Sequence, residues 1–93
     1  MALVFVFHEV ADPEQWSQIW QEGGPRRQML VAAGATAIHT FHDPLEPHKT
    51  GLLVDVVDED QFMELVGSDM IVSTMREDGV KRSSFQLLIE FTS

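Results

Sequence analysis

Residues 3–8 read Leu3-Val4-Phe5-Val6-Phe7-His8 and contain no turn-forming residue. Valine and phenylalanine favour extended backbone and pack well on a pleated surface. Successive side chains of a strand point to opposite faces, so this strand carries apolar side chains on both of its faces. A strand that is apolar on both faces is typical of the middle of a sheet. The segment therefore predicts a central strand.

A helix start follows this strand. Asp12 is suited to the N-cap position, Pro13 to the first helical position, and Gln15 completes a capping-box pattern. Trp16 and Trp20 lie one helical turn apart and predict the buried stripe of the helix. The run 23–25, Gly-Gly-Pro, interrupts or kinks this helix.

The same order of elements recurs in the second half of the chain. Strands are expected at 35–42, 52–57 and 84–91, and a proline-containing loop at 43–51 joins the first two. Residues 58–61, Asp-Glu-Asp-Gln, repeat the helix start, and Gly67-Ser68 breaks the second helix. The pattern predicts one α+β domain over residues 1–93 with ferredoxin-like β-α-β-β-α-β order, a four-stranded antiparallel sheet and both helices on one face.

Such a sheet leaves its second face without a helical cover. Because the strands at 3–8 and 52–57 are apolar on both faces, water is a poor partner for that face. A second copy of the sheet would cover it. We therefore expect a homodimer that pairs through the open sheet face.

The charge balance excludes several classes of partner. The chain has 15 acidic and 6 basic residues and a formal net charge of −9. Such a surface repels phosphate backbones and anionic lipid, so neither nucleic acid nor membrane is an expected partner.

The chain has no cysteine, which excludes disulfides and thiolate chemistry. The apolar run 2–7 is too short for a membrane span, and we expect a cytoplasmic protein.

The chain resembles the dimeric α+β barrel superfamily, which includes antibiotic-biosynthesis monooxygenases, haem-degrading monooxygenases, small cyclases and uncharacterised bacterial members. The resemblance covers nearly the whole chain. It implies pairing through the sheets, and it permits an enzyme, a ligand-binding module or a protein without activity. The segments that carry it are Leu3–His8, Trp16-x-x-x-Trp20, Ala33-Gly34, His39-Thr-Phe-His42-Asp-Pro and Asp78-Gly79.

No complete catalytic set of that superfamily is present. The quinone-forming monooxygenases, which need no cofactor, hold an acidic phenol among Trp, Asn, Tyr and Arg side chains, and this chain has neither Tyr nor Asn. The haem-degrading members need an axial histidine, and no one histidine here is marked for that role. We therefore expect no cofactor.

The candidate catalytic residues are His8 and His39, because histidine titrates near neutral pH and serves as a general base or ligand. Both are expected to line a pocket between sheet and helices, with Trp16 and Trp20 as a flat aromatic wall. Each has a simpler explanation, since a strand-end histidine commonly bonds backbone and paired tryptophans commonly form core. The candidate ligand-binding residues are Trp16, Trp20, Phe41 and Met63.

No metal site is predicted. His39 and His42 are three residues apart, so a regular strand sends them to opposite faces. One alternative stays open around the proline loop. There a metal could be held by nitrogen and oxygen ligands from His42, Asp43 and His48, although no tight spacing motif supports it.

Two functions stay open at this level. The first is a non-catalytic dimeric module that binds a small molecule or only assembles. The alternative is a cofactor-independent monooxygenase-like or cyclase-like enzyme, in which a histidine moves a proton on an aromatic or polyketide-like ligand. A cavity that holds a histidine would discriminate between them.

Overall fold

The computed structural model describes residues 2–91 and has the predicted order of strands, with each predicted helix divided into two. The first half is β1 (Ala2–Val10), α1 (Pro13–Ile19), α2 (Pro25–Ala32) and β2 (Ala35–His42). The second half is β3 (Lys49–Val56), α3 (Glu59–Val66), α4 (Asp69–Glu77) and β4 (Val80–Ile89).

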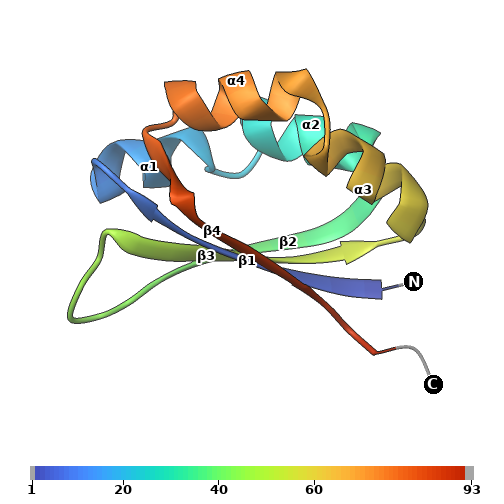
Figure 1. The fold of residues 1–93 in the computed structure, drawn as a ribbon, viewed down its shortest axis with the longest axis horizontal. Coiled ribbons are helices and arrows are strands. Elements are labelled where there is room, and N and C mark those ends of the chain that lie inside the picture. The colour runs from blue at the N-terminus through green and yellow to red at the C-terminus, as the bar shows by residue number, and fades with distance from the viewer. Residues whose placement is uncertain (1, 92–93) are drawn as a thin grey trace.

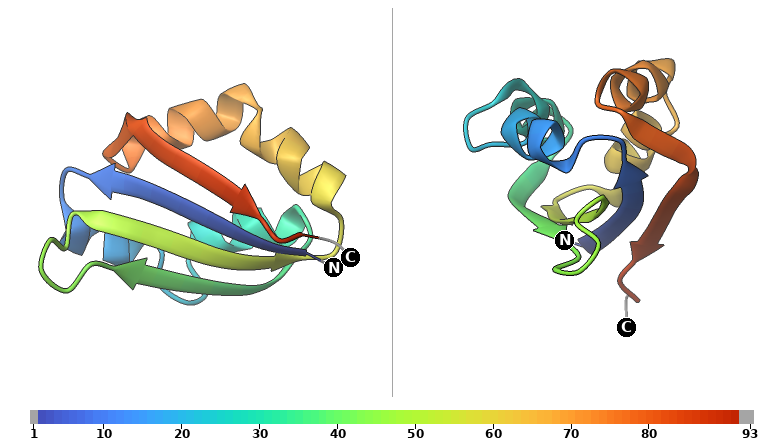
Figure 2. Two further views of the ribbon diagram at one scale, coloured as in Figure 1. Left: turned by 60° about the horizontal axis from the view of Figure 1, so that its bottom comes forward. Right: turned by 90° about the vertical axis from the view of Figure 1, so that its left-hand side faces the viewer.

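The four strands form one antiparallel sheet in the order β2-β3-β1-β4. All four helices lie on one face of it (Figure 1). Seen from the end, α1 and α2 form one pair and α3 and α4 form another, side by side above the sheet (Figure 2). This is the predicted ferredoxin-like α+β fold, and β1 is a central strand as expected.

The core lies between the sheet and the helices. Alternate residues of β1, from Ala2 to Val10, point to this side and are buried. Val4, Val54 and Val56 are the largest fully buried side chains, and all come from the two central strands. The intervening residues Leu3, Phe5 and Phe7 point to the open face and are exposed.

The predicted caps are formed. The Asp12 carboxylate accepts hydrogen bonds from the backbone N–H groups of Glu14 and Gln15, both at 3.1 Å. Asp58 caps α3 in the same manner, and the Ser68 hydroxyl caps α4 after the break at Gly67. Each cap satisfies N–H groups that the helix itself leaves without acceptors.

Two irregularities change which side chains face the helices. In β2 the register shifts between Ala35 and Ala37, so Ala35 lies opposite the buried Val56 but Ala37 lies opposite Asp55. In β4 the register with β1 shifts between the pairs Phe7–Gln86 and Glu9–Lys81. Such bulges insert unpaired residues and re-aim their neighbours. The last strand also begins earlier than predicted, at Val80 instead of Ser84.

Candidate functional site

A small cavity of about 60 Å³ lies between the sheet and the four helices. Three polar side chains, His8, Thr74 and Asp78, line it, and Trp16 and Trp20 contribute aromatic surface. The rest of the lining is apolar and comes from α2, α3, α4 and three strands: Val6, Met29, Leu30, Leu52, Val54, Phe62, Val66, Ile71, Met75, Val80 and Phe85.

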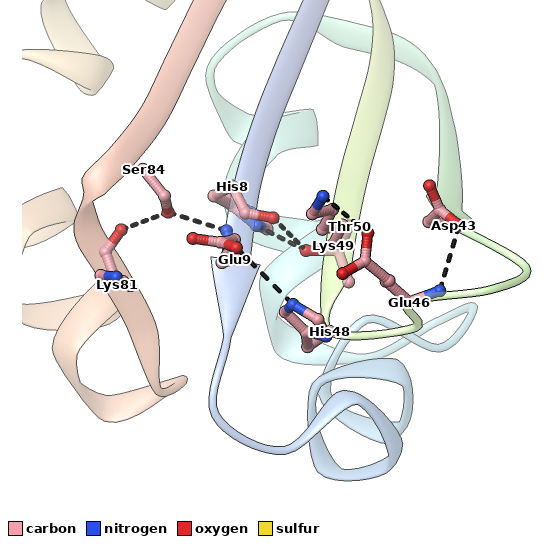
Figure 3. Close-up of polar contacts among 9 residues, drawn as sticks. All are labelled: His8, Glu9, Asp43, Glu46, His48, Lys49, Thr50, Lys81 and Ser84. Atoms are coloured by element: carbon pink, nitrogen blue, oxygen red, sulfur yellow. Dashed lines mark hydrogen bonds and ion pairs between the residues drawn. The ribbon is translucent and has the colours of Figure 1, made fainter.

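His8 is buried on the helix side of β1, directly opposite Thr50 of β3. The Thr50 hydroxyl oxygen lies 2.6 Å from Nδ1 of His8 and 3.0 Å from the His8 carbonyl oxygen (Figure 3). The ring also meets Trp16 edge to face, with ring centres 5.4 Å apart. Strand pairing and aromatic packing together fix the orientation of the imidazole.

The two contacts of Thr50 assign the protons of the pair. A carbonyl oxygen only accepts, so the Thr50 hydroxyl donates its single proton to the His8 carbonyl. The same oxygen then accepts from Nδ1–H of His8. In the arrangement that satisfies both contacts at once, the neutral ring carries its proton on Nδ1 and Nε2 holds a free lone pair.

Burial lowers the pKa of His8 below its usual value, because the charged ring would lose its hydration. The backbone hydrogen bond of the residue and the negative charge of Asp78 oppose this shift only in part. His8 is thus neutral at pH 7. A neutral imidazole with a free Nε2 is a hydrogen-bond acceptor and a proton acceptor.

Trp16 and Trp20 form the wall predicted from their spacing, with ring centres 6.0 Å apart and planes inclined by 37°. Both side chains are buried, and within residues 2–91 neither indole Nε1–H has a hydrogen-bond partner. A buried N–H without an acceptor costs about 1–3 kcal/mol.

Asp78 carries the one negatively charged side chain that lines the cavity. Its buried carboxylate accepts from Arg26 of α2, at 3.0 Å from Nε and 2.8 Å from a terminal nitrogen. This contact raises the pKa of Arg26 and keeps the guanidinium charged. The ion pair joins the two helix pairs and balances the charge of Asp78.

The structure brings together His8, Trp16 and Trp20 but not His39. His39 was expected to face the helices, and this placement is wrong, because it lies exposed on the open sheet face. The physical reason is the irregularity between Ala35 and Ala37, which turns Ala37 and His39 away from the side that Ala35 faces.

The two other predicted ligand-binding residues also lie outside the cavity. Phe41 is exposed on the open face, where its ring lies 6.4 Å from that of Phe5. Met63 is exposed on α3 and does not line the cavity.

Thr50 and Asp78 were missed as site residues. Position 50 falls within the proline-containing loop expected at 43–51, although β3 begins at Lys49 and pairs Thr50 with His8. The Asp78-Gly79 pair enters the sequence analysis only as a segment of the family resemblance. The available signal for Asp78 was an acidic residue beside a turn glycine, which does not by itself reveal a buried ion pair.

A second, wider hollow of about 680 Å³ lies at the end of the sheet where β1 and β3 meet the β2–β3 loop. Its floor is aromatic: Phe5 and Phe7 stack with their rings inclined by only 4°, and Phe41 lies beside them. His8 lines both the interior cavity and this hollow, and Thr50 lines the hollow.

Charged groups surround the loop end of this hollow. His48 Nε2 lies 3.6 Å from a carboxylate oxygen of Glu9, and Lys49 pairs with Glu46 at 2.7 Å (Figure 3). Nδ1 of His42 lies 3.2 Å from the backbone carbonyl oxygen of Asp43. Within residues 2–91, His42, Asp43 and His48 do not come together as a set of metal ligands. Over residues 2–91, no group of three or more His, Asp or Glu side chains is placed to hold a metal ion.

The helices are short, and none of those within residues 2–91 has the length and apolar character to cross a membrane.

No protein-family model and no curated protein matches the sequence. Solved structures do match its fold over nearly the whole chain. An antibiotic biosynthesis monooxygenase is 13% identical with a TM-score of 0.63, and the match covers 100% of this chain and 99% of that one. SnoaB, a cofactor-independent oxygenase from Streptomyces nogalater, is 13% identical with a TM-score of 0.60 and coverages of 99% and 90%.

A dimeric ferredoxin-like protein from an uncultured marine organism is also 13% identical, with a TM-score of 0.56 and coverages of 99% and 91%. At such identities the likeness concerns the fold. The chain therefore has the ferredoxin-like fold of the antibiotic-biosynthesis-monooxygenase-like proteins, which is the resemblance that its sequence indicates.

Proposed function

We propose that this protein is a homodimeric small-molecule-binding domain whose ligand occupies the cavity beside His8. The observation that carries the proposal is the arrangement of His8: a buried, neutral imidazole, oriented by Thr50, at a largely apolar cavity. Pockets that bind small molecules combine an apolar lining with a few oriented polar groups.

The open sheet face supports the homodimer. Phe5, Phe7, Phe41 and Leu88 are 38%, 40%, 47% and 61% exposed on it. Exposed apolar patches of this kind mark interaction surfaces. One solved protein of the same fold is itself described as dimeric. A second copy of the sheet would cover these side chains.

A second candidate is an enzyme that moves a proton on its ligand. His8 favours it, because a neutral imidazole with a free Nε2 at a largely apolar cavity is suited to take a proton. SnoaB, which shares the fold, is described as a cofactor-independent oxygenase. In this candidate the ligand loses a proton to Nε2 of His8. All further bond changes take place within the ligand.

Xenon tests whether the cavity accepts a guest, since it enters apolar cavities without needing hydrogen bonds. A crystal of the full chain under xenon pressure is expected to show density between Trp16, Trp20 and Met75. Thr74→Leu should reduce that occupancy, because it extends an apolar side chain into the cavity. Ser73→Leu, an exposed position on the same helix, is the matched control. Absence of xenon from the wild-type cavity would contradict the proposal.

A further inference from the structure

We infer that the open sheet face pairs with a second copy of this chain in the antiparallel sense. The acidic end of the face (Asp55 and Glu90) then lies on the basic end (Lys49 and Lys81) of the other copy. The inference rests on the homodimer of the proposed function and adds the orientation of its two subunits. It is carried by the distribution of charge on this face.

The acidic end lies where β1 begins. Asp55 pairs with Leu3, and the backbone N–H of Glu90 donates to the Leu3 carbonyl at 2.9 Å. Residues paired across neighbouring strands share a face, and Leu3 points to the open face. Ile89 packs against the core, so the next residue, Glu90, points the other way. Two carboxylates therefore flank Leu3 on the open face.

The basic end lies where β1 ends. Glu9 pairs with Lys49 on β3 and with Lys81 on β4, so a lysine flanks it on either side (Figure 3). Lys81 follows Val80, which packs against the core, and therefore points to the open face. Two positive charges flank one negative charge at this end.

Three of the four charged groups that define the two ends have no partner of their own. Lys49 contacts Glu46 of the neighbouring loop at 2.7 Å. Within residues 2–91, Asp55, Glu90 and Lys81 make no ion pair. These groups are therefore available to a second copy.

The middle of the face is apolar. Phe5 and Phe7 stack there, Leu53 pairs with Phe5, and Gly51 pairs with Phe7. Gly51 has no side chain and lines the wide hollow beside the Phe7 ring. A side chain from a second copy can fill that space. The apolar middle supplies a contact surface, and the charges at its two ends decide its orientation.

Two aligned sheets related by a two-fold axis can pair face to face in two ways. An axis along the strands sets like ends together and gathers Asp55 and Glu90 of both copies at one end. An axis across the strands sets opposite ends together. Like charges at an interface are unfavourable, whereas opposite charges fix its register. The charge pattern therefore favours the axis across the strands.

This antiparallel arrangement makes specific contacts. Asp55 of one copy faces Lys49 of the other, and Glu90 faces Lys81. Packed sheets lie about 10 Å apart, a gap that a lysine and a carboxylate side chain together can span. In the middle, Leu53 of one copy lies over Gly51 of the other, because the two residues lie on the same strand on either side of the axis.

Crosslinking tests the orientation, because the chain has no cysteine and any introduced thiol is unique. Asp55→Cys and Lys49→Cys proteins are mixed, left to exchange subunits and treated with a short bis-maleimide. We expect covalent dimers from the mixture and few from either variant alone. An axis along the strands would instead place Asp55 over Leu3 of the other copy. Efficient crosslinking of Asp55→Cys with Leu3→Cys would therefore overturn the inference.

Charge reversal tests the same contacts without a crosslinker. Lys49→Glu and Asp55→Lys should each weaken the dimer about three- to thirtyfold, because each sets like charges together at two symmetric contacts. The double variant should recover most of the affinity. Glu64→Lys is the matched control, because Glu64 is exposed on α3 and the change in net charge equals that of Asp55→Lys. Its dissociation constant should stay within about twofold of the wild type. Sedimentation equilibrium measures these constants.

The outcomes separate the two proposals. A monomeric wild-type protein would contradict the homodimer of the proposed function and the inference with it. A stable wild-type dimer without crosslinks between Asp55→Cys and Lys49→Cys would overturn the orientation and leave the homodimer intact. The same holds for a double variant that stays as weak as the single variants.

Discussion

The hydroxyl oxygen of Thr50 lies 2.6 Å from Nδ1 of His8 and 3.0 Å from the carbonyl oxygen of the same residue. The two residues face each other on neighbouring strands, and both are buried. One hydroxyl therefore satisfies a buried donor and a buried acceptor together. The orientation of the imidazole at the cavity depends on this threonine.

Thr50→Val removes that hydroxyl at nearly constant volume. The change leaves the His8 N–H buried without an acceptor, so the free energy of unfolding should fall by about 2 kcal/mol. Urea denaturation measures the difference.

Thr36→Val is the matched control, because the Thr36 hydroxyl also donates across strands, to the Asp55 carbonyl at 3.3 Å, but is exposed. Its cost should stay within about 0.5 kcal/mol. Equal costs for the two variants would show that the Thr50 contact is no stronger than a surface bond.

The buried His8 predicts a stability that depends on pH. Burial lowers its native pKa, and the unfolded residue titrates near 6.5. As the pH falls below 6.5, the unfolded chain binds a proton that the native chain excludes, so the free energy of unfolding decreases. The decrease continues down to the lowered native pKa, with a slope of at most about 1.4 kcal/mol per pH unit.

His8→Gln should reduce this slope when urea denaturation is repeated at several pH values. His39→Gln changes an exposed histidine of the same sheet and should retain it. An unchanged slope in the His8 variant would mean that other groups cause the dependence.

Arg26 is predicted to stabilise the molecule through Asp78. Arg26→Gln leaves a buried carboxylate without its cation, so unfolding should become about 2–3 kcal/mol easier. Glu77, the second and exposed partner of Arg26, offers the comparison. Glu77→Gln should cost no more than about 0.5 kcal/mol, and a larger cost than that of Arg26→Gln would reverse the assignment.

The homodimer is tested by a charge placed on the open face. Phe5→Glu puts a carboxylate within the aromatic cluster of Phe5, Phe7 and Phe41 and should convert the dimer to a monomer. Light scattering coupled to size exclusion measures the mass.

Val31→Glu supplies the control, because Val31 is equally apolar and 58% exposed but lies on α2, on the other side of the molecule. This variant should keep the wild-type mass. A monomeric wild-type protein would contradict pairing through the sheet.

Local chemistry made the elements predictable. Asp12 and Asp58 signal helix starts because each side chain accepts hydrogen bonds from backbone N–H groups two or three residues later. The apolar side chains on both faces of Leu3–His8 signal a central strand. These signals depend only on nearby residues, and the structure confirms them. The site is harder to predict, because it depends on pairs such as His8–Thr50 and Arg26–Asp78 that are 42 and 52 residues apart.

His39 shows why face assignment fails. Simple alternation places Ala35, Ala37 and His39 on one face, but one register shift separates the first from the other two. Nothing in the local sequence marks that shift, because alanine fits either face. A single unpaired residue therefore moved one predicted catalytic histidine out of the site.

The protonation of the His8 ring tests the account most directly. Long-range proton–nitrogen correlation spectra at pH 7, with His8→Gln used to assign the signals, distinguish the two neutral forms and the charged ring. We expect the neutral form with the proton on Nδ1 and a bare Nε2. A proton on Nε2, or a charged ring, would contradict the acceptor role of His8 on which the proposed function depends.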